Sequence, residues 1–281
     1  MGMHSTTQLK RDWSAIALGA LFVVMLVWWL AISNLGEDPA SIHAKMIWGA
    51  SYQLVALWGG IWGLIISTAW GGTRSVMGRS IMAFAIGLLL QNFGQSVFSY
   101  YNLVAQVELP YPSMADIGFF GSIPFYAYGT VMLARASGVK ISLRTFSSKL
   151  QAVTIPLIML GLSYFFFLRE YEIDPAAPLR TFLDFGYPLG QAFYVSLALL
   201  TYLLSTRTLG GVMKNRVLLI LFALVVQYAA DYNFLFQASS GTWSVSGYGD
   251  VIYLLAYFLM AISLLQLKTR FIRTRNSEEK S

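Results

Sequence analysis

Long apolar segments recur along the chain and are separated by short polar connections. Apolar runs of about 17–25 residues with at most one charged residue are long enough to cross a bilayer as helices. Eight such runs occur, at residues 13–33, 46–70, 80–104, 115–134, 151–168, 182–205, 217–236 and 250–267. They are too long and too continuously apolar for the strands of a membrane barrel. The pattern predicts an all-α, polytopic membrane helical bundle with eight transmembrane helices, forming a single membrane domain over residues 1–281.

The first apolar run has some features of a signal peptide. It follows Lys10 and Arg11, and it ends in Ala31-Ile32-Ser33, which is similar to a cleavage site. However, the apolar stretch is longer than the roughly 7–15 residues of a signal-peptide core. We therefore expect this segment to remain as the first transmembrane helix.

Positive charge is distributed unequally between the two sides of the predicted bundle. If the N-terminus is cytoplasmic, all but three of the 19 lysines and arginines lie in the tails or the inner connections. The three on the outer side are Lys45, Arg169 and Arg180. Because cytoplasmic connections of membrane proteins are enriched in positive charge, we predict that both termini are cytoplasmic. The expected location is the cell membrane, as a multi-pass protein.

Composition restricts the chemistry that this bundle can perform. Charged residues make up 11% of the chain, against roughly 25% in soluble domains, so the expected solvent is lipid. The chain has no cysteine, and its two histidines, His4 and His43, lie outside the apolar runs, which argues against thiolate metal sites and membrane haem. No lysine lies deep in a run for a retinal Schiff base, and no hydrolase or nucleotide-binding motif is present. We expect no enzyme activity, no catalytic or metal site, no cofactor and no nucleic acid partner.

The third and seventh runs carry polar residues with the same spacing. The two sets are Gln91, Gln95 and Phe98 after Arg79, and Gln227, Asp231 and Phe234 after Arg216. The spacing i, i+4, i+7 places each set on one helical face. Both helices lead to an aspartate that opens the next run, Asp116 or Asp250. We expect a duplicated four-helix unit, residues 13–136 and 150–270, with the two copies parallel, an arrangement that also occurs in transporters.

The polar residues of the apolar runs lie toward the predicted outer face. With a rise of about 1.5 Å per residue, Asp231 lies about 22 Å above Arg216 in a core about 30 Å thick. A carboxylate at this depth costs at least ~2.5 kcal/mol unless it is paired or hydrated, so we expect Asp231 to face the interior. Its expected partners are the amides of the third run, with Tyr187 or Asp184. We predict a ligand-binding site in the outer third of the bundle, with candidate residues Asp231, Gln95, Gln91, Asn92, Gln227, Asp116, Asp250, Asp184 and Tyr187.

Most of these residues also have a structural interpretation. Ser113 and Asp116 fit a capping box, and Asp184 and Asp250 lie in first helical turns, where the helix dipole favours an acid. The amides could form hydrogen bonds between helices. The outer aromatic residues are typical of an interfacial belt, and the alternative is a cup that stacks on a ligand. They are Tyr52, Tyr100, Tyr101, Tyr111, Trp243, Tyr248 and Tyr253. At the inner side, we expect four cations to contact the anionic lipids of the inner leaflet. They are Lys268, Arg270, Arg273 and Arg275.

One segment, Pro110-Tyr111-Pro112-Ser113-Met114-Ala115-Asp116, resembles a motif of a known family. Similar segments occur in the multi-helix N-terminal membrane modules of bacterial diguanylate cyclases, phosphodiesterases and sensor kinases. The resemblance covers about residues 80–268, with Tyr187-Pro188-Leu189 opening a second copy, although Ile123-Pro124 replaces the family's tyrosine–proline pair. It implies a sensor of an extracytoplasmic or membrane cue. No output domain follows Lys268, so we expect such a sensor to signal through a separate membrane or cytoplasmic protein partner.

Three functions are compatible with these features. They are a membrane sensor or ligand-binding module, a non-catalytic accessory subunit of a larger membrane complex, and a small-solute or ion transporter. A transporter needs polar residues through the depth of the membrane. Residues 82–90, 217–226 and 261–267 are almost wholly apolar, which disfavours transport. A bound small molecule would favour the sensor, and a co-purifying membrane protein the accessory subunit.

Overall fold

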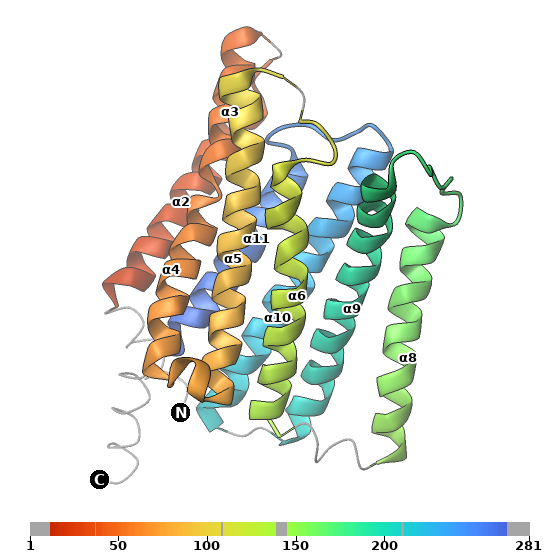
Figure 1. The fold of residues 1–281 in the computed structure, drawn as a ribbon. Helices are drawn as coiled ribbons and strands as arrows, with labels where there is room; N and C mark the ends of the chain where they lie inside the picture. Colours follow the sequence, from red (N-terminus) through yellow and green to blue (C-terminus); the bar gives the residue numbers. More distant parts are fainter. Residues whose placement is uncertain (1–11, 37, 108, 139–144, 209–210, 269–281) are drawn as a thin grey trace.

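The computed structural model describes residues 12–36, 38–107, 109–138, 145–208 and 211–268, and every regular element in these ranges is helical (Figure 1). The helices are α2 (Trp13–Ser33), α3 (Pro39–Ser51), α4 (Leu54–Ala69), α5 (Val76–Tyr100), α6 (Met114–Ala136), α8 (Phe146–Ser163), α9 (Pro178–Thr208), α10 (Gly211–Ser239) and α11 (Tyr248–Leu265). Single π-helical turns extend α5 to Ala105 and α8 to Leu168. Within the described ranges, eight segments are long and apolar enough to cross a membrane, and α3 and α4 together form one of them. This confirms the predicted all-α class and the number of candidate membrane helices.

Several helices begin before the apolar run that predicted them, because polar residues cap them. The second span begins at Pro39 rather than near Met46. The Asp38 carboxylate accepts hydrogen bonds from the backbone N–H groups of Ala40 and Ser41, both at 3.1 Å. The hydroxyl of Ser41 also donates to this carboxylate and lowers the pKa of Asp38. Hydropathy identifies the membrane core of a helix but not its polar first turn.

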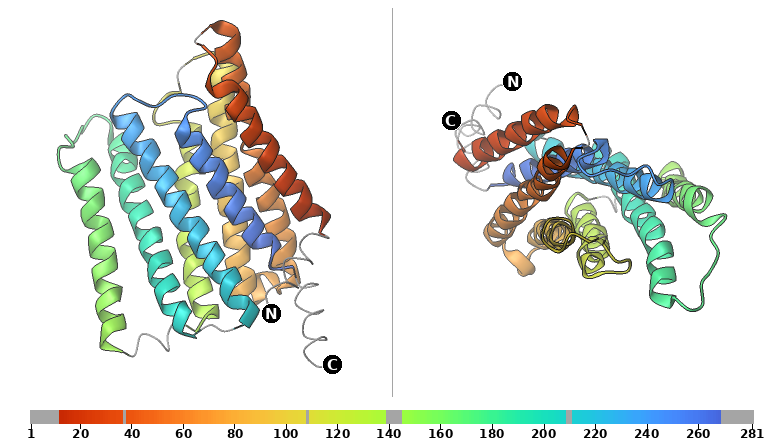
Figure 2. Two further views of the ribbon diagram at one scale, coloured as in Figure 1. Left: turned by 180° about the vertical axis from the view of Figure 1, so that it is seen from behind. Right: turned by 90° about the horizontal axis from the view of Figure 1, so that it is seen from above.

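Helices α4, α5, α6, α9, α10 and α11 form a closed ring in that order, because α11 packs back against α4. Two helices lie outside the ring. Helix α2 packs against α11 and α3, and α8 packs chiefly against α9. Figures 1 and 2 show α2 and α8 at opposite edges of the molecule. The interior of the ring is therefore the place where side chains from both halves of the chain can meet.

Successive spans run in opposite directions, so the connections gather at two ends of the bundle (Figure 1). The upper end in Figure 1 holds the connections that follow α2, α5, α8 and α10. The described basic residues separate between the ends as the charge pattern predicted. The upper end has Lys45, Arg169 and Arg180, and the lower end has Arg74, Arg79, Arg135, Lys149, Lys214, Arg216 and Lys268.

Glycines bring α5 and α6 into close contact at the upper end. A Cβ atom on Gly118 would lie 2.4 Å from the carbonyl oxygen of Leu90 and 2.5 Å from the backbone nitrogen of Gly94. No side chain fits in this space, so glycine is required. Small residues allow the backbones of membrane helices to approach closely. This contact fixes the start of α6, where Asp116 lies, against α5.

Tryptophan side chains attach α2 to the other helices. Three indole N–H groups donate across this interface, from Trp48 to the carbonyl of Met25 at 2.8 Å, from Trp58 to that of Ser14 at 3.1 Å and from Trp29 to that of Ser246 at 2.8 Å. These bonds join α2 to α3, to α4 and to the connection before α11. They also satisfy buried indole donors that lipid could not satisfy.

Candidate functional site

Asp231 lies in the interior of the ring, on α10, and is 6% exposed. Its carboxylate accepts hydrogen bonds from the hydroxyl of Tyr194 at 2.8 Å, the hydroxyl of Tyr253 at 3.0 Å and Nε2 of Gln227 at 3.0 Å. These donors come from α9, α11 and α10. Within the described ranges, Asp231 forms no ion pair. The predicted inward orientation is confirmed, and neutral donors stabilise the carboxyl group.

The partners of Asp231 differ from those that we expected. The expected amides of Gln91, Asn92 and Gln95 lie on α5, but α10 packs between α9 and α11. Helix α5 packs between α4 and α6, and its amides bond instead to residues of α3, α6 and α11 and to Gln53, which precedes α4. The prediction was wrong because shared spacing along two helices does not determine which helices are adjacent.

Gln91 is a second buried polar group, and it connects the two halves of the ring. Its Nε2 donates to Oγ of Ser122 on α6 at 2.8 Å, and its Oε1 accepts from the hydroxyl of Tyr257 on α11 at 3.1 Å. The rings of Tyr257 and Tyr253 lie 5.9 Å apart. Because Tyr253 also donates to Asp231, two tyrosines one helical turn apart on α11 link Asp231 to Gln91.

We name this set the tyrosine network, and it takes residues from α5, α6, α9, α10 and α11. All of its members are buried except Tyr253, which is partly buried. It comprises Gln91, Tyr126, Tyr194, Gln227, Asp231, Tyr253 and Tyr257. Tyr126 joins it through its ring, which lies 5.8 Å from that of Tyr194 in an edge-on arrangement. A carboxyl group held by neutral donors can gain or lose a proton without breaking an ion pair. A proton would add an O–H donor to the carboxyl group and reduce its acceptor capacity, which would weaken the hydrogen bonds from its neighbouring donors.

Gln95 and Asn92 instead satisfy a break in the second span, between α3 and α4. The side-chain amide of Gln95 donates to the backbone carbonyl of Gly49 at 3.1 Å. The side-chain amide of Gln53 donates to the backbone carbonyl of Ala50 at 2.8 Å. Asn92 then donates to Oε1 of Gln53 at 3.0 Å. These amides replace the backbone donors that a continuous helix would supply. For Gln95 and Asn92, the structural interpretation therefore accounts for the contacts.

Asp116 and Asp184 lie at the upper end, where α6 meets α9. The hydroxyl of Tyr187 donates to Asp116, and the hydroxyl of Tyr111 donates to Asp184, each at 2.7 Å. The predicted capping box is present, since the backbone N–H of Ser113 donates to Asp116 at 2.7 Å. The segment that carries the family resemblance thus binds α9 through one donor and one acceptor.

Asp184 also accepts a hydrogen bond from the hydroxyl of Tyr171 at 2.7 Å, and it lies 3.7 Å from Nε of Arg180. Burial and the hydrogen bond to Asp184 raise the pKa of Tyr111. The hydrogen bond to the same carboxylate raises the pKa of Tyr171. Both hydroxyls therefore remain protonated at neutral and mildly alkaline pH, and the contact at Asp184 persists over this range.

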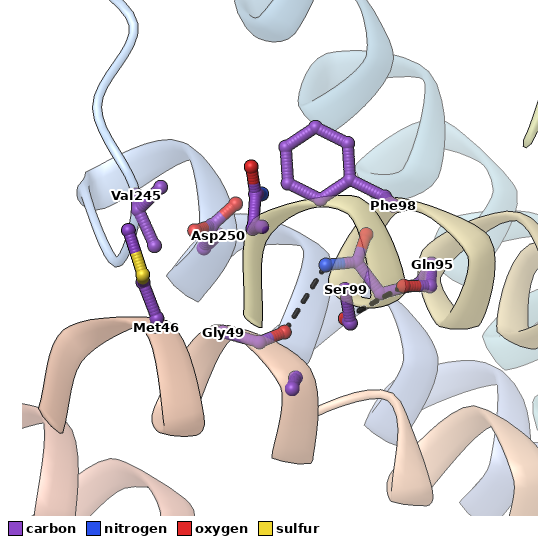
Figure 3. A pocket seen from close by; sticks show the side chains of 9 residues that line it. Met46, Gly49, Gln95, Phe98, Ser99, Val245 and Asp250 are labelled. Atoms are coloured by element: carbon purple, nitrogen blue, oxygen red, sulfur yellow. Dashed lines mark hydrogen bonds between the residues drawn. The ribbon is translucent and has the colours of Figure 1, made fainter. Parts of the chain in front are cut away.

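Asp250 lies at the edge of a small cavity at the upper end (Figure 3). The residue is 8% exposed, and its Oδ2 accepts from the backbone N–H of Ser246 at 2.8 Å. The cavity is lined by Met46, Gly49, Ala50, Gln95, Phe98, Ser99, Asn102, Val245 and Asp250. Its volume of about 10 Å³ is enough for about one water molecule. In this conformation the cavity is too small for an organic ligand.

The structure brings some of the predicted site residues together and separates others. Asp231 contacts Gln227, Asp116 contacts Tyr187, and Gln95 shares the small cavity with Asp250. Gln91 belongs to the tyrosine network but does not bond to Asp231. Asn92 lies at the helix break, and Asp184 lies at the partly exposed upper end of α9. The candidates therefore form several separate clusters rather than one site.

Sequence reasoning missed most of the tyrosines of the network. Tyr194 follows Tyr187 by seven residues and Tyr257 follows Asp250 by seven, so each lies on the same helical face as a predicted site residue. This spacing is the signal that could have identified them. Tyr253 was assigned to the interfacial aromatic belt, but its hydroxyl donates to Asp231. Tyr248, assigned to the same belt, is 75% exposed, as a belt residue should be.

Lys268 occupies a different environment from the expected headgroup surface. Its Nζ lies 2.8 Å from Oδ2 of Asp12, and its side chain is 10% exposed. The expectation of lipid contact therefore rests on Arg270, Arg273 and Arg275, which lie outside the described residues.

Comparisons with protein-family models, with curated proteins and with solved structures find no match to this chain. Within the described residues, no group of three or more His, Cys, Asp or Glu side chains could hold a metal ion. The functional argument therefore rests on the geometry of the ring and its two ends.

Proposed function

We propose that this protein is an integral membrane sensor or ligand-binding module, with the tyrosine network as its responsive element and a separate protein as its signalling partner. The observation that carries the proposal is the environment of Asp231, which is 6% exposed and bonded to neutral donors. A carboxylate within the membrane costs at least ~2.5 kcal/mol unless it is paired or hydrated. An amide could fill the same place with a smaller desolvation cost, so a group that can change its charge supports a functional role.

A change of charge at Asp231 would act on three helices at once. Its donors Tyr194 and Tyr253 lie on α9 and α11, on either side of α10. If a proton or a cation reached the carboxyl group, its negative charge would be neutralised and the hydrogen bonds from these two hydroxyls would weaken. The packing of α9 and α11 against α10 would then adjust. Helix packing is bistable rather than continuously deformable, so a small local change can select a second arrangement.

We also propose that the upper end faces the outside of the cell membrane and that both termini are cytoplasmic. The concentration of basic residues at the lower end supports this orientation.

A parallel duplication of residues 13–136 and 150–270 is supported by the order of the ring. Helices α4, α5 and α6 are followed by α9, α10 and α11, and α6 packs on α9 as α11 packs on α4.

Transport is less well supported, because apolar side chains fill the lower half of the ring. Phe84 and Leu88 on α5, and Ile220 and Leu224 on α10, are fully buried. A transport path would need polar groups or water at this depth.

The accessory-subunit alternative is favoured by one observation, the volume of the cavity beside Asp250, which leaves no space for an organic ligand.

Native mass spectrometry of the chain in nanodiscs, extracted from cells that produce it, tests the proposal. The variants are Asp231→Asn, Asp231→Leu and, as a matched control, Asp174→Asn in the exposed connection before α9. We expect a partner protein to be extracted with the wild type and with the control variant. With Asp231→Asn, we expect the fraction of chains that carry this partner to change by at least about twofold while the yield of the variant is unchanged. Extraction without a partner would contradict the proposal. If a partner binds and its occupancy is the same with both Asp231 variants as with wild type, this chain is an accessory subunit instead.

A further inference from the structure

At the lower end, the residue that caps α2 meets the residues that follow α11. Nζ of Lys268 lies 2.8 Å from Oδ2 and 3.0 Å from Oδ1 of Asp12, and it also donates to Oγ of Ser14. The same ammonium group lies 4.0 Å from the centroid of the Trp62 ring. Asp12 is fully buried. We name these four residues the lower-end latch.

We propose that the lower-end latch is a conformational switch that α11 couples to the tyrosine network. In the closed state the latch holds α2 and the end of α11 together. Its opening would free the lower ends of both helices to contact the partner protein. The inference rests on the proposed function for its input, and it adds the output end of the same molecule.

The free energy of burying an ion pair favours a contact that opens and closes over one that only stabilises the fold. Removing two charges from water is costly, and well-packed apolar residues of similar volume often close an interface equally well or better. If either charge were removed, the other would lose the ion pair that compensates for its burial. The latch therefore depends on both partners, Asp12 and Lys268, and opens as a unit. A two-state element of this kind is what conformational coupling requires.

Helix α11 connects the latch to the tyrosine network. In its upper half, Tyr253 donates to Asp231 and Tyr257 donates to Gln91. Just after its lower end, the carbonyl of Leu267 accepts from the indole of Trp70 at 2.7 Å, next to the latch. The helix runs without interruption from Tyr248 to Leu265. A shift at the network is therefore carried to the lower end as movement of one rigid rod.

The corresponding outer helix of the other half begins with a different kind of residue. Under the proposed duplication, α8 corresponds to α2, so the N-cap of α8 corresponds to Asp12. That N-cap is Thr145, whose hydroxyl carries no charge. In the part of the chain that the structure describes, α2 thus begins with a charged cap that pairs with Lys268, and α8 begins with a neutral cap.

A single buried thiol can report the opening of the latch. The chain has no cysteine, so Ala15→Cys introduces one thiol at a buried position of α2 beside the latch and leaves the four latch side chains in place. Its reaction with N-ethylmaleimide in nanodiscs, where both ends are accessible, measures the population of the open state. In this background the variants are Lys268→Met, Asp12→Asn and Lys268→Arg. We expect the first two to label about tenfold faster or more, and Lys268→Arg, which keeps the charge, to label slowly.

The coupling is tested with Tyr253→Phe, which removes one hydroxyl from the network, and with Tyr248→Phe as a matched control on the same helix. We expect Tyr253→Phe to accelerate labelling about threefold and Tyr248→Phe to leave it unchanged. Size-exclusion elution and yield establish that each variant is folded. Unchanged labelling in Lys268→Met and Asp12→Asn would overturn the latch. Equal labelling in the two tyrosine variants would overturn the coupling but leave the proposal for Asp231 intact, because native mass spectrometry tests that proposal separately.

Discussion

The outer helices α2 and α8 lie at opposite edges of the molecule, but they are attached in different ways. Helix α2 is held by indole hydrogen bonds along its length and by the lower-end latch. A polar contact of α8 in the described part of the chain is made by Ser163, whose hydroxyl bonds to the carbonyl of Pro188 at 3.0 Å and to the hydroxyl of Tyr232. An outer helix can therefore be attached to this ring without an ion pair. The additional polarity at α2 indicates a specific contact rather than a general requirement of the fold.

The exposed faces of the two helices differ as well. The apolar window of α8 is 11% buried within the chain, against 22% for α2. Leu157, Val153 and Phe166 of the α8 span are each more than half exposed. In a membrane these side chains contact lipid or a partner protein. The most loosely held helix is thus also the one with the largest surface available for another chain.

The largest expected effect is at the latch. Lys268→Ala leaves the Asp12 carboxylate buried without its cation, so we expect a loss of about 3–5 kcal/mol in stability. The midpoint of thermal denaturation in detergent measures the loss. The double variant Asp12→Ala with Lys268→Ala should recover part of it, because no unpaired charge remains. If the single variant is as stable as wild type, the ion pair does not hold α2.

A smaller effect is expected at the upper part of α2. Trp48 is fully buried, and its indole donates to the carbonyl of Met25. Trp48→Phe keeps most of the apolar volume but loses this bond, so we expect a loss of about 1–2 kcal/mol by the same assay. Trp13→Phe is the matched control, because Trp13 is 59% exposed. Equal midpoints for the two variants would show that the indole bonds do not attach α2.

Removing the polar attachment of α8 should cost less. Ser163→Ala deletes the bond to the carbonyl of Pro188, but the hydroxyl of Tyr232 also lies 3.3 Å from that carbonyl and remains. We therefore expect about 0.6 kcal/mol, the average for hydrogen bonds between membrane helices. Ser163→Thr should retain the bond. A loss as large as that of Lys268→Ala would remove the distinction between the two outer helices.

The smallest effect on stability is expected at the exposed face of α8. Phe166 is 56% exposed. Phe166→Ala should therefore change the free energy of unfolding, measured from the denaturation midpoint, by less than about 0.5 kcal/mol. The informative measurement is partner occupancy by native mass spectrometry. A stable variant that loses its partner would identify α8 as the docking surface. An unchanged complex would leave α8 as a lipid-facing helix.

The membrane helices were predictable because each is determined locally. A long apolar run has no alternative in lipid, and the predicted cap at Ser113 follows from residues next to the helix that it begins. The inward orientation of Asp231 was predictable for the same reason, since lipid cannot solvate a carboxylate. These conclusions need only the sequence of one segment and the properties of its surroundings.

The partners of the polar residues were not predictable, because they depend on which helices are adjacent. Nothing in hydropathy indicates that α10 lies between α9 and α11, so the amides of α5 were assigned wrongly to Asp231. The break between α3 and α4 contains neither proline nor a turn motif, so the role of Asn92 and Gln95 there was not apparent. The ion pair between Asp12 and Lys268 spans almost the whole chain, and no local pattern predicts it.

The order of the ring has a consequence for biosynthesis. Helices leave the ribosome in chain order, and neighbours such as α5 and α6 can pair as soon as both are made. The ring cannot close until α11, the last described helix, packs on α4. Before that step, Asp12 lacks its ion pair with Lys268, and Asp231 lacks the hydrogen bond from Tyr253 of α11. Nascent chains interrupted before α11 would expose both acids, a feature by which membrane quality control could recognise unfinished molecules.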